Sequence, residues 1–248
     1  KNTKGPGRWI WQLEYQRLKQ QEEAVFPWFD RHTVITKQDQ QLIHHPDNEQ
    51  IKVISNGIDL QYFQLPDPSP EKDVDILFAG NMSYAPNVRA AQFIAEKVVP
   101  LLRPSFPQLR VALVGTDPHP QVKQLAGKEV EVTGWVENIA HWYARSKVMF
   151  APMEIGAGLQ NKLLEAMALQ LPCVTSPMAR QAMDSATHDF VPVAEQPEEY
   201  ATVLADLLQD AAKRKALGQA GYQYVTRHHD WGAISERLDH YLTGSSPI

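Results

Sequence analysis

From Asp75 onward, short runs of apolar residues alternate with segments in which apolar residues recur every three or four positions. A strand buried in a parallel sheet reads as such a run, whereas the longer spacing is typical of helices. The predicted strands are Asp75–Ala79, Leu109–Val114, Glu129–Thr133, Val148–Ala151, Cys173–Ser176 and Asp189–Val193. The alternation predicts an α/β fold, a Rossmann-like, doubly wound parallel sheet with right-handed crossovers and a helical C-terminal tail.

Helices are expected between these strands and on both sides of the sheet. Asn87 can cap a helix from Val88 to Leu102, and Asp230 can cap the last helix of the chain. The other predicted helices are Arg8–Val25, Lys37–His45, Asn138–Arg145, Glu198–Gln209 and Ala212–Arg227, with the last helix covering Trp231–Leu242. Two further strands are expected before the sheet, one within Asp30–Thr36 and one at Ile51–Ile54.

Three prolines in a polar run between Gln64 and Asp73 mark the strongest domain boundary. We therefore divide the chain into residues 1–54, a linker at 55–73, the sheet domain at 74–227 and a final helix at 228–248. Glycines follow four of the predicted segments of the sheet domain, at Gly80, Gly115, Gly134 and Gly156. They should lie along the carboxyl edge of the sheet, where proteins of this class bind ligands.

The helix expected after Gly156 and Gly158, ending before Pro172, has apolar residues around most of its circumference. A helix of that kind is buried. Its polar residues Asn161, Lys162 and Glu165 share one narrow stripe, because positions three and four apart lie on the same face. The stripe can line a cleft, with an anion at the helix N-terminus, or it can be a surface Lys–Glu pair on an ordinary core helix. The pattern favours neither interpretation.

Composition narrows the possible partners. The net charge is -5, the isoelectric point is about 6.0 and no dense basic run occurs, which argues against nucleic-acid binding. No apolar run approaches the roughly 18 residues of a membrane span, and no signal peptide is visible. The single cysteine, Cys173, is expected to be an inert core residue in a reducing compartment. We expect a cytoplasmic protein with at most peripheral contact at the inner membrane face, and the start at Lys1 suggests a fragment.

Each candidate site residue has an ordinary structural alternative. Gly80 and Asn81 can form a backbone platform for phosphate or sugar, although a glycine after a strand is a weak signal. Arg89 can reach a phosphate or can be a solvated surface residue. Trp135 can form a wall for a nucleobase or can pack under the sheet. Glu154, at a strand end, can be a general acid or base or a structural carboxylate. The histidines lack the spacing of a zinc site, and no Gly-x-Ser-x-Gly element is present, so metal ligation and hydrolysis through a nucleophile have no support.

Several of these segments, in this order, resemble the C-terminal half of family 4 (group 1) glycosyltransferases. The resemblance is strongest to bacterial exopolysaccharide-type sugar transferases and extends from about Asp30 to Leu242. It rests on Ile54–Asp59, Phe78–Met82, Pro86–Asn87, Val132–Val136, Gly156 with Gly158, Lys162–Ala168 and Pro172–Val174. The family consists of retaining enzymes with the two-domain GT-B fold, so residues 1–54 would be the tail of the N-terminal acceptor domain, and the last helix would cross back to it.

The resemblance implies a role for each matching residue. Glu165 matches the second glutamate of the family's E-x7-E motif, which binds the ribose of the donor, and Lys162 matches the basic, catalytic position near the diphosphate. Gly80 and Asn81 match the loop that approaches the phosphates. Gly134, Trp135 and Val136 match the segment along the nucleobase. The remaining donor-binding candidates are Arg89, Gly156, Gly158 and Asn161.

The chain departs from the family pattern at two points. Ala157 stands where the first glutamate of E-x7-E is expected, and the usual arginine-containing turn after the first strand is replaced by Asn81–Ser83. The expected function is transfer of a hexose from an NDP-sugar to a glycan or lipid-linked acceptor in polysaccharide biosynthesis, without a metal or other cofactor. A fragment without the acceptor domain would be inactive by itself. A GT-B-like nucleotide-sugar epimerase and a non-catalytic nucleotide-binding or interaction module are the alternatives.

Overall fold

The computed structural model describes residues 7–155 and 158–244. The chain divides into two compact units, one formed by residues 1–55 with 237–248 and the other by residues 56–236. The division falls after Ser55 and inside the last helix, α11 (Trp231–Thr243).

The smaller unit is built from short elements. A parallel pair of two-residue strands, β1 (Thr33–Val34) and β2 (Lys52–Val53), confirms both strands expected before the sheet. The helices are α1 (Gly7–Val25) and α2 (Lys37–Leu42), with 3-10 turns at Phe26–Trp28 and Asn48–Gln50. The Phe26 ring stacks on His32 and on His45, with ring centroids 3.8 Å apart in both pairs. Helix α2 ends three residues earlier than predicted, because Ile43 already has an extended backbone.

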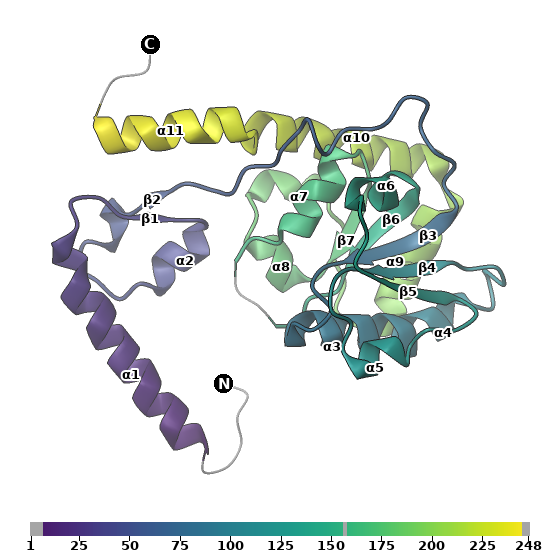
Figure 1. The fold of residues 1–248 in the computed structure, drawn as a ribbon, viewed down its shortest axis with the longest axis horizontal. Helices are drawn as coiled ribbons and strands as arrows, with labels where there is room; N and C mark the ends of the chain where they lie inside the picture. The colour runs from purple at the N-terminus through teal and green to yellow at the C-terminus, as the bar shows by residue number, and fades with distance from the viewer. Residues whose placement is uncertain (1–6, 156–157, 245–248) are drawn as a thin grey trace. The chain divides into compact units, whose positions relative to one another are not determined.

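The larger unit contains a five-stranded parallel sheet in the order β5-β4-β3-β6-β7 (Figure 1). The strands are β3 (Val74–Ala79), β4 (Val111–Val114), β5 (Val130–Gly134), β6 (Ser146–Ala151) and β7 (Cys173–Thr175). Strands β3, β4, β6 and β7 are almost wholly buried, as their continuous apolar runs predicted. The chain moves outward from β3 to β5 and then returns to β6 on the other side of β3, so the topology reverses between β3 and β6.

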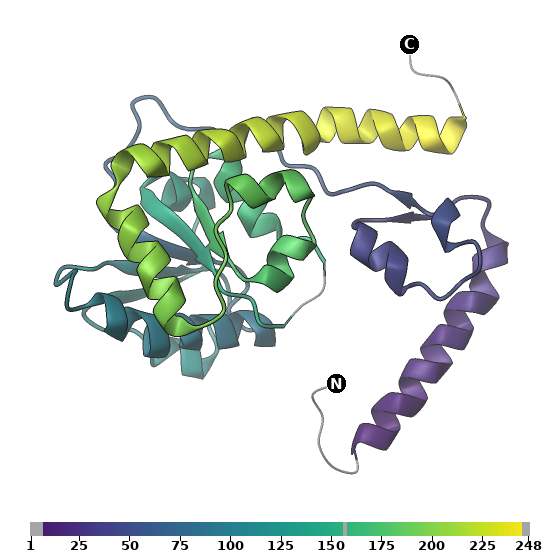
Figure 2. The same ribbon diagram turned by 180° about the vertical axis from the view of Figure 1, so that it is seen from behind.

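Helices cover both faces of this sheet, which confirms the doubly wound α/β prediction (Figure 1). The helices α3 (Ala85–Phe93), α4 (Val99–Leu102) and α5 (Pro120–Lys123) lie on one face; α6 (Ile139–Ala144) and α7 (Asn161–Ala168) lie on the other. A π-helical segment, Ile94–Val98, joins α3 to α4. The remaining helices are α8 (Pro177–Gln181), α9 (Pro197–Gln209), α10 (Ala211–His228) and α11. A 3-10 turn lies at Ser185–Asp189. Helix α9 packs against α4 and β6, and α10 packs along α7 (Figure 2).

The structure corrects two predictions on the α3 face and at the sheet edge. Helix α3 begins at Ala85 with Tyr84 at its N-cap, so Asn87 does not cap it. Pro86 fixes a helical φ in the first turn, and the buried Asn87 side chain donates instead to the Asn81 carbonyl at 2.9 Å. Asp189–Val193 is not a strand: Val193 forms a single bridge to Thr175, because Pro192 supplies a carbonyl and has no N–H for a ladder.

Helix α7 ends at Ala168, before the position predicted from Pro172. Gln170 adopts a left-handed conformation with φ of +53°, and the Leu171 amide donates to the Ala166 carbonyl at 2.9 Å. The Gln170 amide donates to the Met167 carbonyl, which completes a Schellman motif. The predicted cap of α11 is confirmed, since the Asp230 carboxylate accepts from the Ala233 amide at 3.0 Å.

Candidate functional site

A cleft of about 460 Å³ opens at the carboxyl edge of the sheet, beside the reversal between β3 and β6. Its walls come from the ends of β3 and β4, the segment after β5, and the helices α6 and α7. Ligands of open α/β sheets bind at this reversal point, because the loops on its two sides diverge and leave a crevice.

The floor of the cleft is backbone at Gly80 and Gly115, which end two neighbouring strands. Both have a positive φ, of +154° and +151°. A Cβ atom on Gly115 would lie 1.7 Å from the Gly80 carbonyl oxygen, so only glycine allows the two chain segments to approach this closely. The result is a side-chain-free surface that a phosphate or sugar can approach.

Lys162 lies in the first turn of α7 and its ammonium group reaches back toward the floor. Its Nζ atom donates to Asn87 Oδ1 at 2.7 Å and lies 4.4 Å from the centroid of the Phe78 ring. Burial lowers the pKa of Lys162 to about 8, against the attraction of the Glu165 carboxylate. This cation is therefore only partly compensated, and a bound anion would stabilise its charged form.

Glu165 follows one turn later and faces the same cleft. Its Oε2 atom accepts from the Tyr143 hydroxyl at 2.7 Å. Burial raises the pKa of Glu165, while the Tyr143 hydrogen bond and the Lys162 charge act in the opposite direction. Burial also raises the pKa of Tyr143 well above its ordinary value, so this hydroxyl stays a donor and holds the carboxylate in one orientation.

The outer wall of the cleft is formed by Trp135 and Val136, after β5. Trp135 is 70% exposed, so it does not pack under the sheet and presents its ring to the cleft and to solvent. At the opposite side, the Asn161 Oδ1 atom accepts from Asn56 Nδ2 at 3.0 Å. A flat aromatic ring beside the cleft can stack on a planar heterocycle.

The structure brings together most of the residues expected at the site. Seven of them line the cleft: Gly80, Asn81, Trp135, Val136, Asn161, Lys162 and Glu165. Gly134 and Gly158 are adjacent to lining residues without contributing to the lining, and Gly156, like Ala157, lies outside the described residues. Arg89 is exposed on α3 and does not line the cleft; the neighbouring Asn87 contacts Lys162 instead.

Sequence reasoning missed Asn87 and Tyr143 as parts of the site. Asn87 was interpreted as a helix cap, because asparagine before an apolar run is the usual cap signal. Tyr143 lies 22 residues before Glu165, and only the packing of α6 beside α7 joins them. No local pattern in the sequence points to Tyr143, because α6 also carries the exposed His141 and the half-buried Trp142.

The polar stripe of α7 lines a cleft, so it is not a pair on an open surface. Across residues 7–155 and 158–244, no three histidine, cysteine, aspartate or glutamate side chains gather closely enough to hold a metal ion. Cys173 is buried as predicted, and burial raises the pKa of its thiol. In the same part of the chain, no helix combines the length and apolarity needed to cross a bilayer.

Comparison with known proteins connects this architecture to a family. The family model described as "Glycosyl transferases group 1" matches residues 73–210, which is more than half of the chain. A search of the curated proteins found no match.

Solved structures share the fold at low sequence identity. Anabaena HepE in complex with UDP and glucose aligns with a TM-score of 0.70 at 15% identity, over 86% of this chain and 62% of that protein. Sucrose-phosphate synthase from Thermosynechococcus elongatus aligns with a TM-score of 0.73 at 19% identity, over 93% of this chain and 63% of that protein. The C-terminal domain of LpcC, a group 1 family glycosyl transferase from Francisella tularensis, aligns at 0.55 and 19% identity, over 71% of this chain and 100% of that domain.

This chain therefore spans less than two thirds of the length of HepE and of the synthase. Its Rossmann-like sheet and its helical tail agree with the expected C-terminal half of a GT-B glycosyltransferase. On the match over residues 73–210, the chain belongs to the group 1 glycosyl transferases.

Proposed function

We propose that the cleft binds the nucleoside diphosphate part of a nucleotide-sugar donor, for a retaining transfer of a hexose to a glycan or lipid-linked acceptor in polysaccharide biosynthesis. The observation that carries the proposal is the placement of Lys162 and Glu165, one turn apart on α7, in a single cleft with a glycine floor. HepE, whose structure was solved with UDP and with UDP-glucose, supports the assignment by its shared fold.

In this proposal each part of the cleft contacts one part of the donor. The diphosphate lies over Gly80 and Gly115 with Lys162 as its counter-ion, and the ribose hydroxyls donate to the Glu165 carboxylate. The base lies along Trp135 and Val136, where an aromatic ring can stack on it. Asn81 and Asn161 add polar groups at the two sides of the diphosphate.

The proposed reaction breaks the bond between the anomeric carbon and the β-phosphate oxygen, and the acceptor hydroxyl oxygen bonds to the same carbon on the same face. The acceptor proton passes to the departing diphosphate. Negative charge develops on the leaving group, and Lys162 stabilises it from a position already desolvated in the free protein. The scheme requires no metal, because a cation is supplied by the chain itself.

Nucleotide binding provides the direct test. We would measure the melting temperature of the chain with UDP, GDP, ADP and dTDP at saturating concentration. A ligand at about 100 times its Kd stabilises the native state by about 2.7 kcal/mol, so the matching nucleotide should raise the melting temperature by roughly 5–10 °C. The shift should disappear in Lys162→Ala and in Glu165→Ala.

The matched control is Lys123→Ala, which removes a lysine from the last turn of α5, outside the cleft. It should keep the full nucleotide-dependent shift. If no nucleotide changes the melting temperature, or if Lys162→Ala and Glu165→Ala respond like the wild type, the donor-binding proposal is wrong. A positive result with UDP alone would also identify the base.

A further inference from the structure

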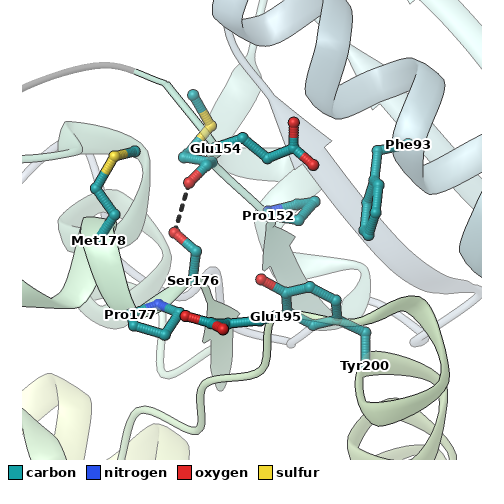
Figure 3. A pocket seen from close by; sticks show the side chains of 9 residues that line it. Phe93, Pro152, Glu154, Ser176, Pro177, Met178, Glu195 and Tyr200 are labelled. Carbon is teal, nitrogen blue, oxygen red and sulfur yellow. Dashed lines mark hydrogen bonds between the residues drawn. The ribbon is translucent and has the colours of Figure 1, made fainter. Parts of the chain in front are cut away.

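A second pocket, which we call the Tyr200 pocket, lies at the same edge of the sheet and has no lining residue in common with the donor cleft (Figure 3). Its volume is about 250 Å³. The residues that matter here are Phe93, Pro152, Glu154, Pro177, Glu195 and Tyr200. They come from the end of α3, the segment after β6, the start of α8 and the region around the start of α9.

Tyr200 has a hydroxyl without a partner. The residue is 2% exposed, and its ring packs against Phe150 and Phe93 at centroid distances of 4.9 and 5.7 Å. Figure 3 shows the hydroxyl directed into the pocket, between the Glu154 and Glu195 side chains. It makes no hydrogen bond to any residue that the structure describes, so it is open to a polar group that enters the pocket.

The Tyr200 pocket carries negative charge from two acidic side chains. The carboxylates of Glu154 and Glu195 line it, and within the described part of the chain neither forms an ion pair. Burial raises the pKa of Tyr200, and the nearby charges of Glu154, Glu195 and Glu199 raise it further. The nearby Ser176 hydroxyl is already used, since it donates to the Met153 carbonyl at 2.6 Å (Figure 3). The open polar groups are therefore two carboxylates and a phenol oxygen, and all three can accept from a cation.

The walls between these groups are apolar. Phe93, Pro152 and Pro177 line the pocket, and an aromatic face adds attraction for a positive charge. A metal ion would need at least a third ligand, and the described residues gather no such group here. The apolar walls match a hydrocarbon chain better than a sugar, which would leave its hydroxyls without partners.

We propose that the Tyr200 pocket binds a short aliphatic ammonium ion, with its charged end between Glu154, Glu195 and the Tyr200 hydroxyl and its hydrocarbon part against Phe93 and the two prolines. This site is independent of the donor-binding proposal, because the two pockets have separate linings. Met153 lies between them: it lines the Tyr200 pocket, and its sulfur is 3.9 Å from Lys162 Nζ.

The test is a titration of the ¹⁵N-labelled full chain with n-butylammonium chloride, in which NMR measures the chemical shifts of the backbone amides. We expect saturable shifts for residues around Phe93, Glu154 and Glu195–Tyr200, with a Kd on the order of millimolar for so small a ligand. The neutral analogue 1-butanol has the same chain and should bind at least about tenfold more weakly, since it lacks the charge. Sodium chloride at equal ionic strength should produce no saturable shift.

Variants locate the binding. Glu154→Gln and Glu195→Gln should each raise the Kd at least about threefold, the double variant should abolish saturation, and Tyr200→Phe should weaken binding about threefold. Glu198→Gln is the matched control: it removes the same charge from α9, outside the pocket, and should leave the Kd unchanged. Both glutamates are exposed, so their replacement keeps the fold even if Tyr200→Phe does not.

Several outcomes would overturn the proposal. They are absence of saturation, equal binding of 1-butanol, a double variant that binds like the wild type, or the same shifts with magnesium chloride. Glu165→Ala should keep ammonium binding, and Glu154→Gln should keep the nucleotide-dependent melting shift, so failure of one site is distinguishable from failure of the other.

Discussion

Lys162 holds a positive charge in a position where water solvates it poorly. Asn87 Oδ1 and the Phe78 ring replace part of the lost hydration, but neither carries a full negative charge. Because the replacement is incomplete, burial lowers the pKa of Lys162 to about 8. A diphosphate in the cleft would complete it, so binding and protonation of this side chain should be linked.

That linkage predicts a pH dependence. Above a pH of about 8, Lys162 of the free protein loses its proton, whereas Lys162 of the diphosphate-bound protein keeps it. The affinity for the nucleotide therefore falls as the pH rises through this value. For a free-state pKa of about 8, the Kd of the matching nucleotide should increase about fourfold between pH 7.0 and pH 8.5. Isothermal titration calorimetry at several pH values would measure it.

Lys162→Arg provides the control, because a guanidinium stays protonated over this range. It should bind more weakly at pH 7 and show a flat profile. An unchanged wild-type Kd up to pH 8.5 would contradict the assignment of Lys162 as the counter-ion.

The free energy of unfolding changes with pH in the opposite direction. Between a pH of about 8 and 10.5, Lys162 is protonated in the unfolded chain and deprotonated in the folded one. The contribution of Lys162 to the free energy of unfolding therefore rises with pH over this range.

A second prediction concerns Tyr143, whose buried hydroxyl donates to Glu165. Tyr143→Phe leaves the carboxylate without this donor, so it should lower the free energy of unfolding by about 1–3 kcal/mol and raise the pKa of Glu165 further. Urea denaturation would measure the first effect. Tyr222→Phe, at an exposed tyrosine of α10, should change stability by less than about 0.5 kcal/mol. Equal effects for the two variants would contradict the role of the hydrogen bond.

At the scale of elements, α7 is fixed from both ends. Its N-terminal turn faces the donor cleft, and the Schellman motif at its C-terminus turns the chain toward β7. Helix α10 packs along α7 (Figure 2). The contact is made through small residues, with Gly218 against the Gln170 backbone and Gly221 against Met167. The orientation of Lys162 and Glu165 therefore depends on how closely α10 approaches.

Gly218→Ala tests this approach. In an exposed helix interior, glycine to alanine stabilises by about 1 kcal/mol, because alanine has the higher helix propensity. At Gly218 a Cβ atom would lie 2.0 Å from the Gln170 carbonyl oxygen, so α10 must move away. We expect a loss of about 2–4 kcal/mol in unfolding free energy, measured by urea denaturation. Ala216→Gly, at an exposed position two residues earlier, should show the ordinary cost of about 1 kcal/mol. A stabilising Gly218→Ala would contradict the described packing.

At the scale of the whole molecule, the two units differ in what they bury. The unit formed by residues 56–236 has a continuous apolar core around its sheet. Among the described residues of the other unit, Ile51 is the one buried apolar side chain, and α1 exposes Trp9, Trp11 and Leu18. Local stability follows buried apolar area, so opening of the smaller unit should require less free energy.

Hydrogen exchange followed by mass spectrometry would test this difference. Amides of α1 and α2 should exchange at least about 100-fold faster than those of β3 and β6, whose strands are central in the sheet. Peptides of α9, in the larger unit, serve as an internal control for a helix on the core. Equal protection of α1 and β3 would show that the two units unfold together.

The sequence predicted the five strands of the sheet, because a strand buried on both faces appears in the sequence as a run of consecutive apolar residues. It also predicted the polar stripe of α7, since that stripe lies within one element. It did not locate the boundaries set by long-range contacts. The end of α7 depends on the left-handed conformation of Gln170. The segment Asp189–Val193 pairs with β7 at one residue only, because Pro192 has no N–H to donate.

What the sequence determined by itself was the fold class. Together with the family resemblance it also named half of the cleft residues, among them Gly80, Lys162 and Glu165. Only the tertiary structure decided how these residues are supported. Asn87 reaches Lys162 across 75 residues, Tyr143 reaches Glu165 across 22, and Tyr200 meets Glu154 in a second pocket. The physical reason is that periodicity records which face of an element is buried, whereas sheet order and helix packing determine what that face contacts.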